Sequence, residues 1–288
     1  MTDVSVIGLG DMGSALARSL LESGYSVSVW NRSGEKAEPL IAAGAELAAS
    51  AADAIIASPA TITCITSHDR TIELIEGIKI PLDGKTIIEL STGGIEEAES
   101  LAKLLEEKGA AWLIGAINAY PSAIGKSETV LMMAGRAETW EDWEKVIRTL
   151  GGGSLCVGDQ ASMVPTLFAA LFTTRQGFMW GMIFGGLACR EAGIPLETFA
   201  SQVPISMGVL PSYHQYFSDS VADGKFESAE ASLATYSAAL DDALSTFDAL
   251  GAPADLPRLF SQLAHKGMEA GLEKKALTAL VGLLQRES

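Results

Sequence analysis

The chain has 288 residues, of which 48% are hydrophobic and 19% charged, so it is long enough for two domains and can bury a substantial core. Its formal net charge of −16 disfavours contact with phosphate backbones, which excludes nucleic acid as an expected partner. Its 3 cysteines have neither zinc-binding nor redox spacing and no secretory signal pattern is found, so we expect a cytoplasmic protein without a metal site.

The first half of the chain alternates strand patterns with helix patterns. Short apolar and β-branched runs predict strands at residues 4–7, 26–30, 61–66, 86–90, 111–116, 130–134 and 154–157. Amphipathic periodicity predicts helices at residues 13–23, 35–44, 95–108 and 139–150. Such alternation is typical of a mostly parallel sheet covered by helices on both faces, the α/β Rossmann class.

A glycine motif, Gly8-x-Gly10-x-x-Gly13, joins the first expected strand to the first expected helix. In this context Gly8 allows a tight turn, Gly10 lets the backbone approach a pyrophosphate, and Gly13 allows close packing of helix on strand. The pyrophosphate would lie at the N-terminus of the helix, where unpaired N–H groups and the helix dipole favour an anion. The motif therefore predicts a dinucleotide-binding site.

The segment after the second expected strand selects the dinucleotide. For NAD, an Asp or Glu in this place accepts hydrogen bonds from the ribose 2′-hydroxyl, but this chain has Asn31, Arg32 and Ser33. The planar guanidinium of Arg32 suits a 2′-phosphate, and Lys36 adds a second positive charge. Asn31 and Ser33 can add neutral donors. We therefore predict NADP(H) as the cofactor; the alternative is that Arg32 and Lys36 are ordinary surface charges.

Beyond residue 158 the pattern changes to helical periodicity. We predict an NADP-binding domain at residues 1–158 and a helical domain at residues 159–288, which begins with a long interdomain helix at about residues 160–192. Residues 163–189 are apolar enough to suggest a membrane span, but a central arginine would cost about 3 kcal/mol there. The sequence therefore favours a buried helix and no membrane partner.

Three glycines on this helix, Gly177, Gly181 and Gly185, recur every four residues and so share one face. Glycine costs roughly 1 kcal/mol in a helix interior, so their presence indicates that another helix packs closely against this face. Packing within the chain and packing against a second copy of it are both open.

Together these segments resemble the β-hydroxyacid dehydrogenase superfamily, and within it the imine reductases and reductive aminases. The resemblance covers nearly the whole chain and is carried by "GLGDMG", "VWNRSGEKAEPL", "CITSHD", "ELSTGG", "GAINAYPSAIG", "LMMAGRAETWEDWEKVIRTLGG" and "FMWGMIFGGLACREAGI". It implies a fold of the 6-phosphogluconate dehydrogenase type: a Rossmann domain and an all-α C-terminal domain joined by a long helix, in a domain-swapped homodimer. The active site would lie between the Rossmann domain of one subunit and the helical domain of the other.

The resemblance also implies an NADPH-dependent oxidoreductase that transfers hydride to the C=N bond of a cyclic imine or iminium ion and yields an amine. By position, it adds to the motif residues the cofactor neighbours Leu9, Asp11, Met12, Thr66, Ser67 and Thr92. Two alternatives are open: an NADPH-dependent carbonyl or β-hydroxyacid reductase, and a non-catalytic NADPH-binding protein.

One position departs from the family pattern. Hydroxyacid dehydrogenases resembling this chain have a proton-transferring lysine on the interdomain helix, and many imine reductases have Asp or Tyr, whereas this chain has Phe168. Hydride transfer to a carbonyl leaves an alkoxide that needs an acid, which phenylalanine cannot supply. An iminium ion arrives already protonated, so Phe168 favours C=N chemistry; a displaced donor and a lost activity are the alternatives.

Candidate residues for the displaced donor and for the substrate pocket follow from the same resemblance. Tyr120, in the "NAYPSAIG" loop, is the candidate catalytic donor, with core packing as the alternative, and His68 is expected to pack against the nucleotide. Arg175 could bind a substrate carboxylate, although a structural ion pair is favoured. The expected pocket is apolar and aromatic and comprises Phe168, Phe172, Arg175, Met179, Tyr213, His214 and Tyr216, with Phe178 and Trp180 nearby. For His214, a structural role is the favoured alternative.

Overall fold

An 8-stranded sheet forms in the first part of the computed structural model, which describes residues 1–227 and 230–284. The strands are β1 (Val4–Ile7), β2 (Val27–Trp30), β3 (Glu46–Leu47), β4 (Ala60–Thr63), β5 (Thr86–Glu89), β6 (Ala111–Ile117), β7 (Leu131–Ala134) and β8 (Leu155–Gly158). Their order is β3-β2-β1-β4-β5-β6-β7-β8, with β6 and β7 antiparallel and the other pairs of this sheet parallel. The mostly parallel sheet predicted from the sequence is confirmed.

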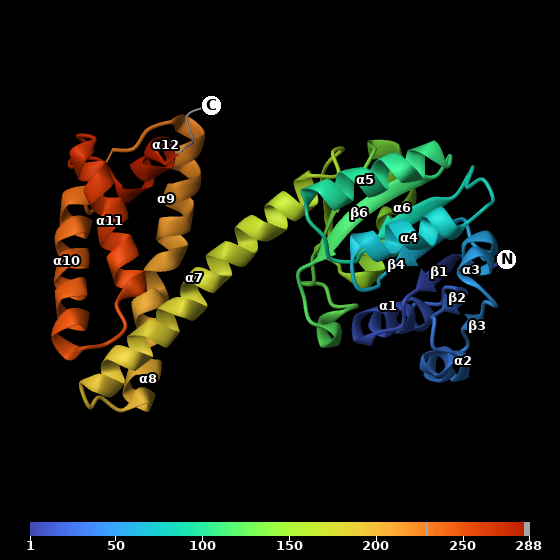
Figure 1. Ribbon diagram of the computed structural model, residues 1–288, viewed down its shortest axis with the longest axis horizontal. Coiled ribbons are helices and arrows are strands. Elements are labelled where there is room, and N and C mark those ends of the chain that lie inside the picture. The colour runs from blue at the N-terminus through green and yellow to red at the C-terminus, as the bar shows by residue number, and fades with distance from the viewer. Residues whose placement is uncertain (228–229, 285–288) are drawn as a thin grey trace. The chain divides into compact units, whose positions relative to one another are not determined.

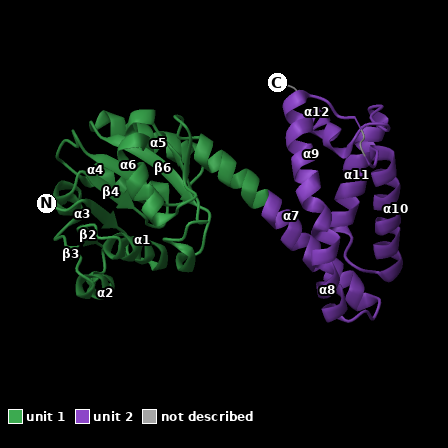
Figure 2. Ribbon diagram, turned by 180° about the vertical axis from the view of Figure 1, so that it is seen from behind, with its two compact units in different colours: residues 1–173 green, residues 174–288 purple. Residues whose placement is uncertain are grey.

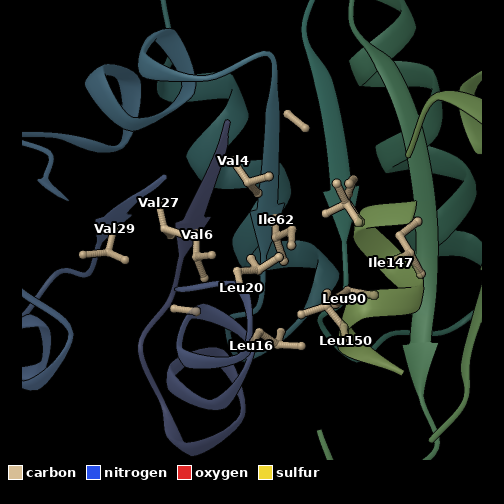
Figure 3. Packing of buried hydrophobic residues seen from close by; sticks show 14 of the residues in the cluster. Val4, Val6, Leu16, Leu20, Val27, Val29, Ile62, Leu90, Ile147 and Leu150 are labelled. Atoms are coloured by element: carbon tan, nitrogen blue, oxygen red, sulfur yellow. The ribbon is translucent and has the colours of Figure 1, made fainter. Parts of the chain in front are cut away.

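Helices cover both faces of this sheet (Figure 1). One face carries α1 (Asp11–Glu22), α2 (Glu38–Ala42) and α6 (Ala137–Leu150), and the other carries α3 (Ala51–Ala57), α4 (His68–Gly77) and α5 (Ile95–Glu107). On the first face, Leu16 and Leu20 of α1 pack against Val6 and Ile62 of the sheet, all with 0% exposure (Figure 3). Burying each such side chain stabilises the folded state by about 1.5–3 kcal/mol. The packing of the helix layer on the sheet therefore holds in place the strand ends next to the site.

Several short elements depart from the sequence patterns, which do not indicate β3, α3 or α4. The helix predicted at residues 35–44 is divided into η1 (Gly34–Ala37) and α2. Pro39 lies in the first turn of α2, where a residue without an N–H donor is tolerated, and this explains the division. The start of α3 does have a local signal, because the Ser50 hydroxyl accepts a hydrogen bond from the Asp53 N–H at 3.1 Å.

The chain divides into two units, residues 1–173 and residues 174–288 (Figure 2). The division falls within α7 (Met163–Glu191), and the domain boundary at residue 158 stays a prediction. The described part of the second unit is helical, as predicted, with one isolated β-bridge between Glu227 and Lys275. Its further elements are α8 (Leu196–Ser206), η3 (Met207–Val209), α9 (Leu210–Asp223), α10 (Leu233–Leu250), α11 (Asp255–Glu269), η4 (Leu277–Ala279) and α12 (Leu280–Leu283).

The prediction that the apolar stretch of α7 is buried is wrong for this single chain. Six large side chains of the helix keep between 42% and 51% of their surface exposed: Leu171, Phe172, Phe178, Met179, Trp180 and Ile183. The helix is apolar around most of its circumference, so one layer of neighbours cannot cover it. Within residues 1–227 and 230–284, no helix has the length and apolar character needed to cross a membrane.

The three glycines of α7 differ in their surroundings. An added Cβ at Gly185 would lie 2.9 Å from the ring of Phe199, so contact with α8 of the same chain explains this glycine. At Gly177 and Gly181, no atom of the described chain would lie within 4 Å of an added Cβ. Packing within the chain therefore accounts for one glycine of the stripe and leaves two without a neighbour.

Candidate functional site

The turn between β1 and α1 has the shape of a phosphate cradle. Gly8 has φ +95, and a Cβ added there would lie 2.3 Å from the carbonyl oxygen of Cys64. A Cβ on Gly13 would lie 1.9 Å from the carbonyl oxygen of Gly8, so α1 approaches the turn more closely than any side chain permits. At Gly10, by contrast, an added Cβ meets no atom within 4 Å, so the chain leaves open the position where the motif expects a pyrophosphate.

This cradle lies where the strand order of the sheet reverses. From β1 the sheet continues to β2 and β3 on one side and to β4 and β5 on the other, and ligands of open α/β sheets bind at such a point. α1 begins here, and its N-cap residue Gly10 has no side chain to bond the first-turn N–H groups. These N–H groups are therefore available to an anion, which fits the phosphates of a dinucleotide.

The residues after β2 differ in what they can offer a nucleotide. The Oδ1 atom of Asn31 accepts a hydrogen bond from the Leu9 N–H at 3.0 Å, and its Nδ2 donates to the Ser33 carbonyl at 3.0 Å. Asn31 thus ties the glycine turn to β2. Arg32 and Lys36 are exposed, and no salt bridge within residues 1–227 and 230–284 includes either of them. Both cations therefore remain available to a phosphate.

A cavity of about 230 Å³ opens next to the cradle, beyond the ends of β4 and β5. Four residues that the sequence predicts near the cofactor or substrate line it: Met12, His68, Thr92 and Phe168. The complete lining is Met12, Cys64, Ile65, His68, Leu90, Ser91, Thr92, Gly93, Gly115, Ala116, Ile117, Val164, Pro165 and Phe168. The cavity is mainly apolar, with a few polar groups on the side of β4 and β5, as in pockets for small organic molecules.

A buried carboxylate lies behind the polar side of this cavity. Glu89, the last residue of β5, has 0% exposure. Its carboxylate accepts hydrogen bonds from the hydroxyls of Thr63 and Thr71 and from the Ser91 N–H, and Nδ1 of His68 lies 2.9 Å from its Oε1. A buried charge requires such pairing, so this network explains how an acid is tolerated in the interior.

The same carboxylate acts on the Cys64 thiol. Burial, and then the charge of Glu89, raises the pKa of Cys64 to about 12. At pH 8 this leaves about a thousandfold less thiolate than a pKa of 9.0 would, and the thiolate is the reactive form. We therefore expect native Cys64 to resist iodoacetamide at pH 8 and to react after unfolding in urea, as measured by peptide mass spectrometry. Equal labelling of native and unfolded protein would contradict this expectation.

The remaining predicted residues of the first unit lie outside the cavity lining. Tyr120 is 76% exposed and precedes the short turn η2 (Pro121–Ala123). The ring of Phe172 stacks on that of Phe168, with centroids 6.1 Å apart. Thr66 is exposed, and the Ser67 hydroxyl caps α4 by accepting from the Arg70 N–H at 3.4 Å. The candidate donor Tyr120 is thus exposed and does not line the cavity.

The other expected pocket residues belong to the second unit. Arg175 and Met179 lie on α7, and Tyr213, His214 and Tyr216 lie on α9. The Tyr216 hydroxyl donates a hydrogen bond to the Glu227 carbonyl. Burial, followed by the neighbouring Tyr236 and Tyr216, raises the pKa of Tyr213. Tyr213 and Tyr216 therefore stand close together within this unit.

Sequence patterns did not single out Glu89, although a signal for it exists. A charged residue between Ile88 and Leu90, in a strand covered on both faces, must have a partner to be buried. That partner is His68, which comes 21 positions earlier and follows the neighbouring strand β4. The expectation that His68 packs near the nucleotide did not include this pairing.

Two family models together match most of the chain. Residues 3–158 match the NAD binding domain of 6-phosphogluconate dehydrogenase, and residues 167–286 match the C-terminal domain of the NADPH-dependent reductive aminase-like family. Among curated proteins, the NADPH-dependent reductive aminase of Aspergillus oryzae is 32% identical over 209 residues, which is 72% of this chain and 68% of that protein.

Solved structures resemble the chain over nearly its whole length. A reductive aminase from Aspergillus terreus, in complex with NADPH and ethyl-5-oxohexanoate, is 28% identical with a TM-score of 0.90, covering 99% of this chain and 100% of that chain. An imine reductase from Myxococcus stipitatus, in complex with NADP+, is 27% identical with a TM-score of 0.90, covering 98% and 100% of the two chains. The similarity thus extends over both units.

Proposed function

This chain belongs to the NADPH-dependent reductive aminase and imine reductase family, and we propose that its substrate is reduced in the cavity beside β4 and β5. It is an NADPH-dependent oxidoreductase that acts on C=N bonds. The sequence motifs predict this activity, and the similarity to reductive aminases and imine reductases supports it. Bound NADPH would supply the hydride. We also propose the cytoplasmic location that the composition and cysteine spacing predict.

The proposed location of the site is supported by residues that border both the phosphate cradle and the cavity. The Cys64 carbonyl lies against Gly8 in the glycine turn, and Cys64 also lines the cavity. Met12, in the first turn of α1, also lines the cavity, so the helix that begins at the cradle reaches the cavity. A dinucleotide held at Gly10, with its 2′-phosphate at Arg32, would therefore be adjacent to the cavity in which a substrate fits.

The cavity lining supports a C=N substrate over a carbonyl. Phe168 provides an apolar wall and no proton, so α7 does not supply here the acid that the family helix supplies elsewhere for an alkoxide. Addition of hydride to an iminium ion gives a neutral amine directly. Tyr120 is exposed and outside the lining, so the described geometry does not favour the carbonyl alternative that depends on it. We propose cyclic imines and iminium ions of small apolar rings as substrates.

A substrate panel tests this proposal. We expect NADPH oxidation, followed by its absorbance, with five- and six-membered cyclic imines and none with the ring ketones of the same size. Product analysis should find the cyclic amine. Turnover of ketones alone would support the carbonyl reductase instead, and absence of turnover on every imine by protein that binds NADPH would contradict the proposal.

We further propose that the chain forms a homodimer through α7. The exposed aromatic and aliphatic side chains of this helix, together with the open faces of Gly177 and Gly181, support a close helix contact with a second copy. In a domain-swapped dimer, the pocket residues of the helical unit would act in the site of the second subunit. These residues are Arg175, Met179, Tyr213, His214 and Tyr216.

Substituting one glycine of α7 tests the dimer. We expect Gly181→Leu to convert the dimer to a monomer in sedimentation velocity, because a leucine side chain would keep the second helix at a distance. NADPH binding by the first unit should persist. The control Gly77→Leu adds the same side chain at an exposed glycine of α4, also without a neighbour within 4 Å, and should leave the dimer intact. A Gly181→Leu protein that sediments as wild type would contradict the proposed contact.

A further inference from the structure

The imidazole of His68 is held rigidly at the edge of the cavity. His68 is the first residue of α4 and is 3% exposed. Its backbone N–H donates to the Thr92 carbonyl at 3.1 Å, and its Nδ1 lies 2.9 Å from Oε1 of Glu89. A Cβ added at Gly93 would lie 2.0 Å from Cδ2 of the ring, so a glycine is needed there to make room for the imidazole. The ring is therefore fixed on two sides by groups of β5 and the loop after it.

The second ring nitrogen, Nε2, has no described hydrogen bond, and its surroundings place it at the cavity. Within residues 1–227 and 230–284, every fully buried side-chain nitrogen or oxygen atom has a hydrogen-bond partner. The described hydrogen bonds of the His68 ring are made by Nδ1 alone. Nε2 must then retain accessible surface, and the surface that His68 exposes belongs to the cavity lining.

Glu89 determines which nitrogen carries the proton. A carboxylate that accepts from Nδ1–H favours the neutral tautomer in which Nδ1 carries the proton and Nε2 has the free lone pair. The other donors on this carboxylate, the hydroxyls of Thr63 and Thr71 and the Ser91 N–H, keep it in place. Such a carboxylate–imidazole pair is the arrangement used for general acid–base catalysis in other enzymes.

We infer that His68 is the catalytic proton donor of this enzyme, acting through Nε2 on the substrate nitrogen, and that Glu89 is its positioning residue. The inference rests on the proposed function and supplies the donor that Phe168 lacks in the same cavity. The Nε2–H bond of the imidazolium breaks and an N–H bond forms on a neutral imine, which becomes the iminium ion. Hydride addition to its carbon then gives the neutral amine, and the neutral imidazole regains a proton from solvent.

Among the cavity-lining groups of residues 1–173, His68 is the one suited to donate a proton. Glu89 approaches from β5 and Cys64 from the end of β4, and the pKa of that thiol, raised to about 12, makes it a poor donor at neutral pH. On α4 itself, Asp69 and Arg70 are exposed. The wall from α7 consists of Val164, Pro165 and Phe168 and has no titratable group.

A comparison of a neutral imine with an iminium ion distinguishes proton donation by His68 from any other role of this residue. We expect His68→Gln to lower kcat for a neutral cyclic imine by 10²- to 10⁴-fold, and to change kcat for the corresponding N-methyl iminium ion, which needs no proton, by less than about threefold. Glu89→Gln should show the same selectivity with a smaller loss. The control His265→Gln, at a half-exposed histidine of α11, should leave both rates unchanged. An equal loss on both substrates would overturn the inference.

A second measurement does not depend on turnover. In protein labelled with ¹⁵N-histidine, His68 is identified as the signal missing from His68→Gln, or from His68→Asn should the first variant not fold. We expect its neutral form to carry the proton on Nδ1, and Glu89→Gln to shift the signals toward the other tautomer. A neutral form protonated on Nε2 would overturn the inference. Failure of the proposed function is distinguishable, because wild-type protein would then reduce neither the imine nor the iminium ion.

Discussion

Replacement of Gly13 by alanine should lower both the stability of the fold and the affinity for NADPH. The added Cβ would lie 1.9 Å from the carbonyl oxygen of Gly8, and neither group is a flexible side chain that can move aside. α1 must then shift away from the sheet, where Leu16 and Leu20 lie in the buried core (Figure 3). Overpacking of this kind typically costs about 1–3 kcal/mol, and we expect the upper end of that range here. The loss should appear as a lower Tm in circular dichroism and as an NADPH Kd raised at least about 100-fold.

Gly10→Ala is the matched control for this variant. Its Cβ meets no protein atom within 4 Å, so we expect a change in the free energy of unfolding of about 1 kcal/mol or less, the scale of an N-cap substitution. NADPH affinity should still fall, because the methyl group would occupy the space left for the pyrophosphate. Wild-type Tm and NADPH affinity in Gly13→Ala would show that the close approach of α1 to the glycine turn is not required.

Removal of the two cations after β2 should abolish the preference for the phosphorylated cofactor. In the double variant Arg32→Ala/Lys36→Ala we expect the Kd for NADPH to rise about 100-fold, since charge-assisted hydrogen bonds contribute about 1.5–3 kcal/mol each and these side chains are exposed. The Kd for NADH, which lacks the 2′-phosphate, should change by less than about threefold. Fluorescence titration with both cofactors measures the two constants.

A charge-matched variant controls for the loss of two positive charges. Arg70→Ala/Lys103→Ala removes an exposed arginine from α4 and an exposed lysine from α5, and it should leave both Kd values near those of the wild type. Raised salt should weaken NADPH binding to the wild type more than to the Arg32→Ala/Lys36→Ala variant, because screening acts on the phosphate contact. An unchanged ratio of NADPH to NADH affinity in that variant would show that other groups hold the 2′-phosphate.

The parts of the fold that the sequence predicts are those with local signals. β-branched runs mark the central strands, and the spacing of Gly8, Gly10 and Gly13 marks the cofactor turn, so the α/β fold, the family and the NADP(H) cofactor are confirmed. β3 has only two residues and α3 seven, too few for a periodic pattern to be distinct from a loop.

The site and the exposed helix depend on relations that are not local. Glu89 and His68 meet because β4 and β5 are neighbours in the sheet, and that strand order has no signal in either segment. The apolar character of α7 predicts that its side chains will be covered, but the pattern is the same for a neighbour in the same chain and for one in a second copy. The expectation of a buried α7 failed for this reason.

Isotope transfer tests the assignment of this chain as a C=N reductase most directly. Protein incubated with a cyclic imine and NADPH labelled with deuterium at C4, in each of the two stereochemical forms, should yield a cyclic amine with one deuterium on the former imine carbon from one form. Mass spectrometry and proton NMR of the product determine the position of the label. Unlabelled amine from both forms, or no amine from protein that binds NADPH, would contradict direct hydride transfer to the C=N carbon.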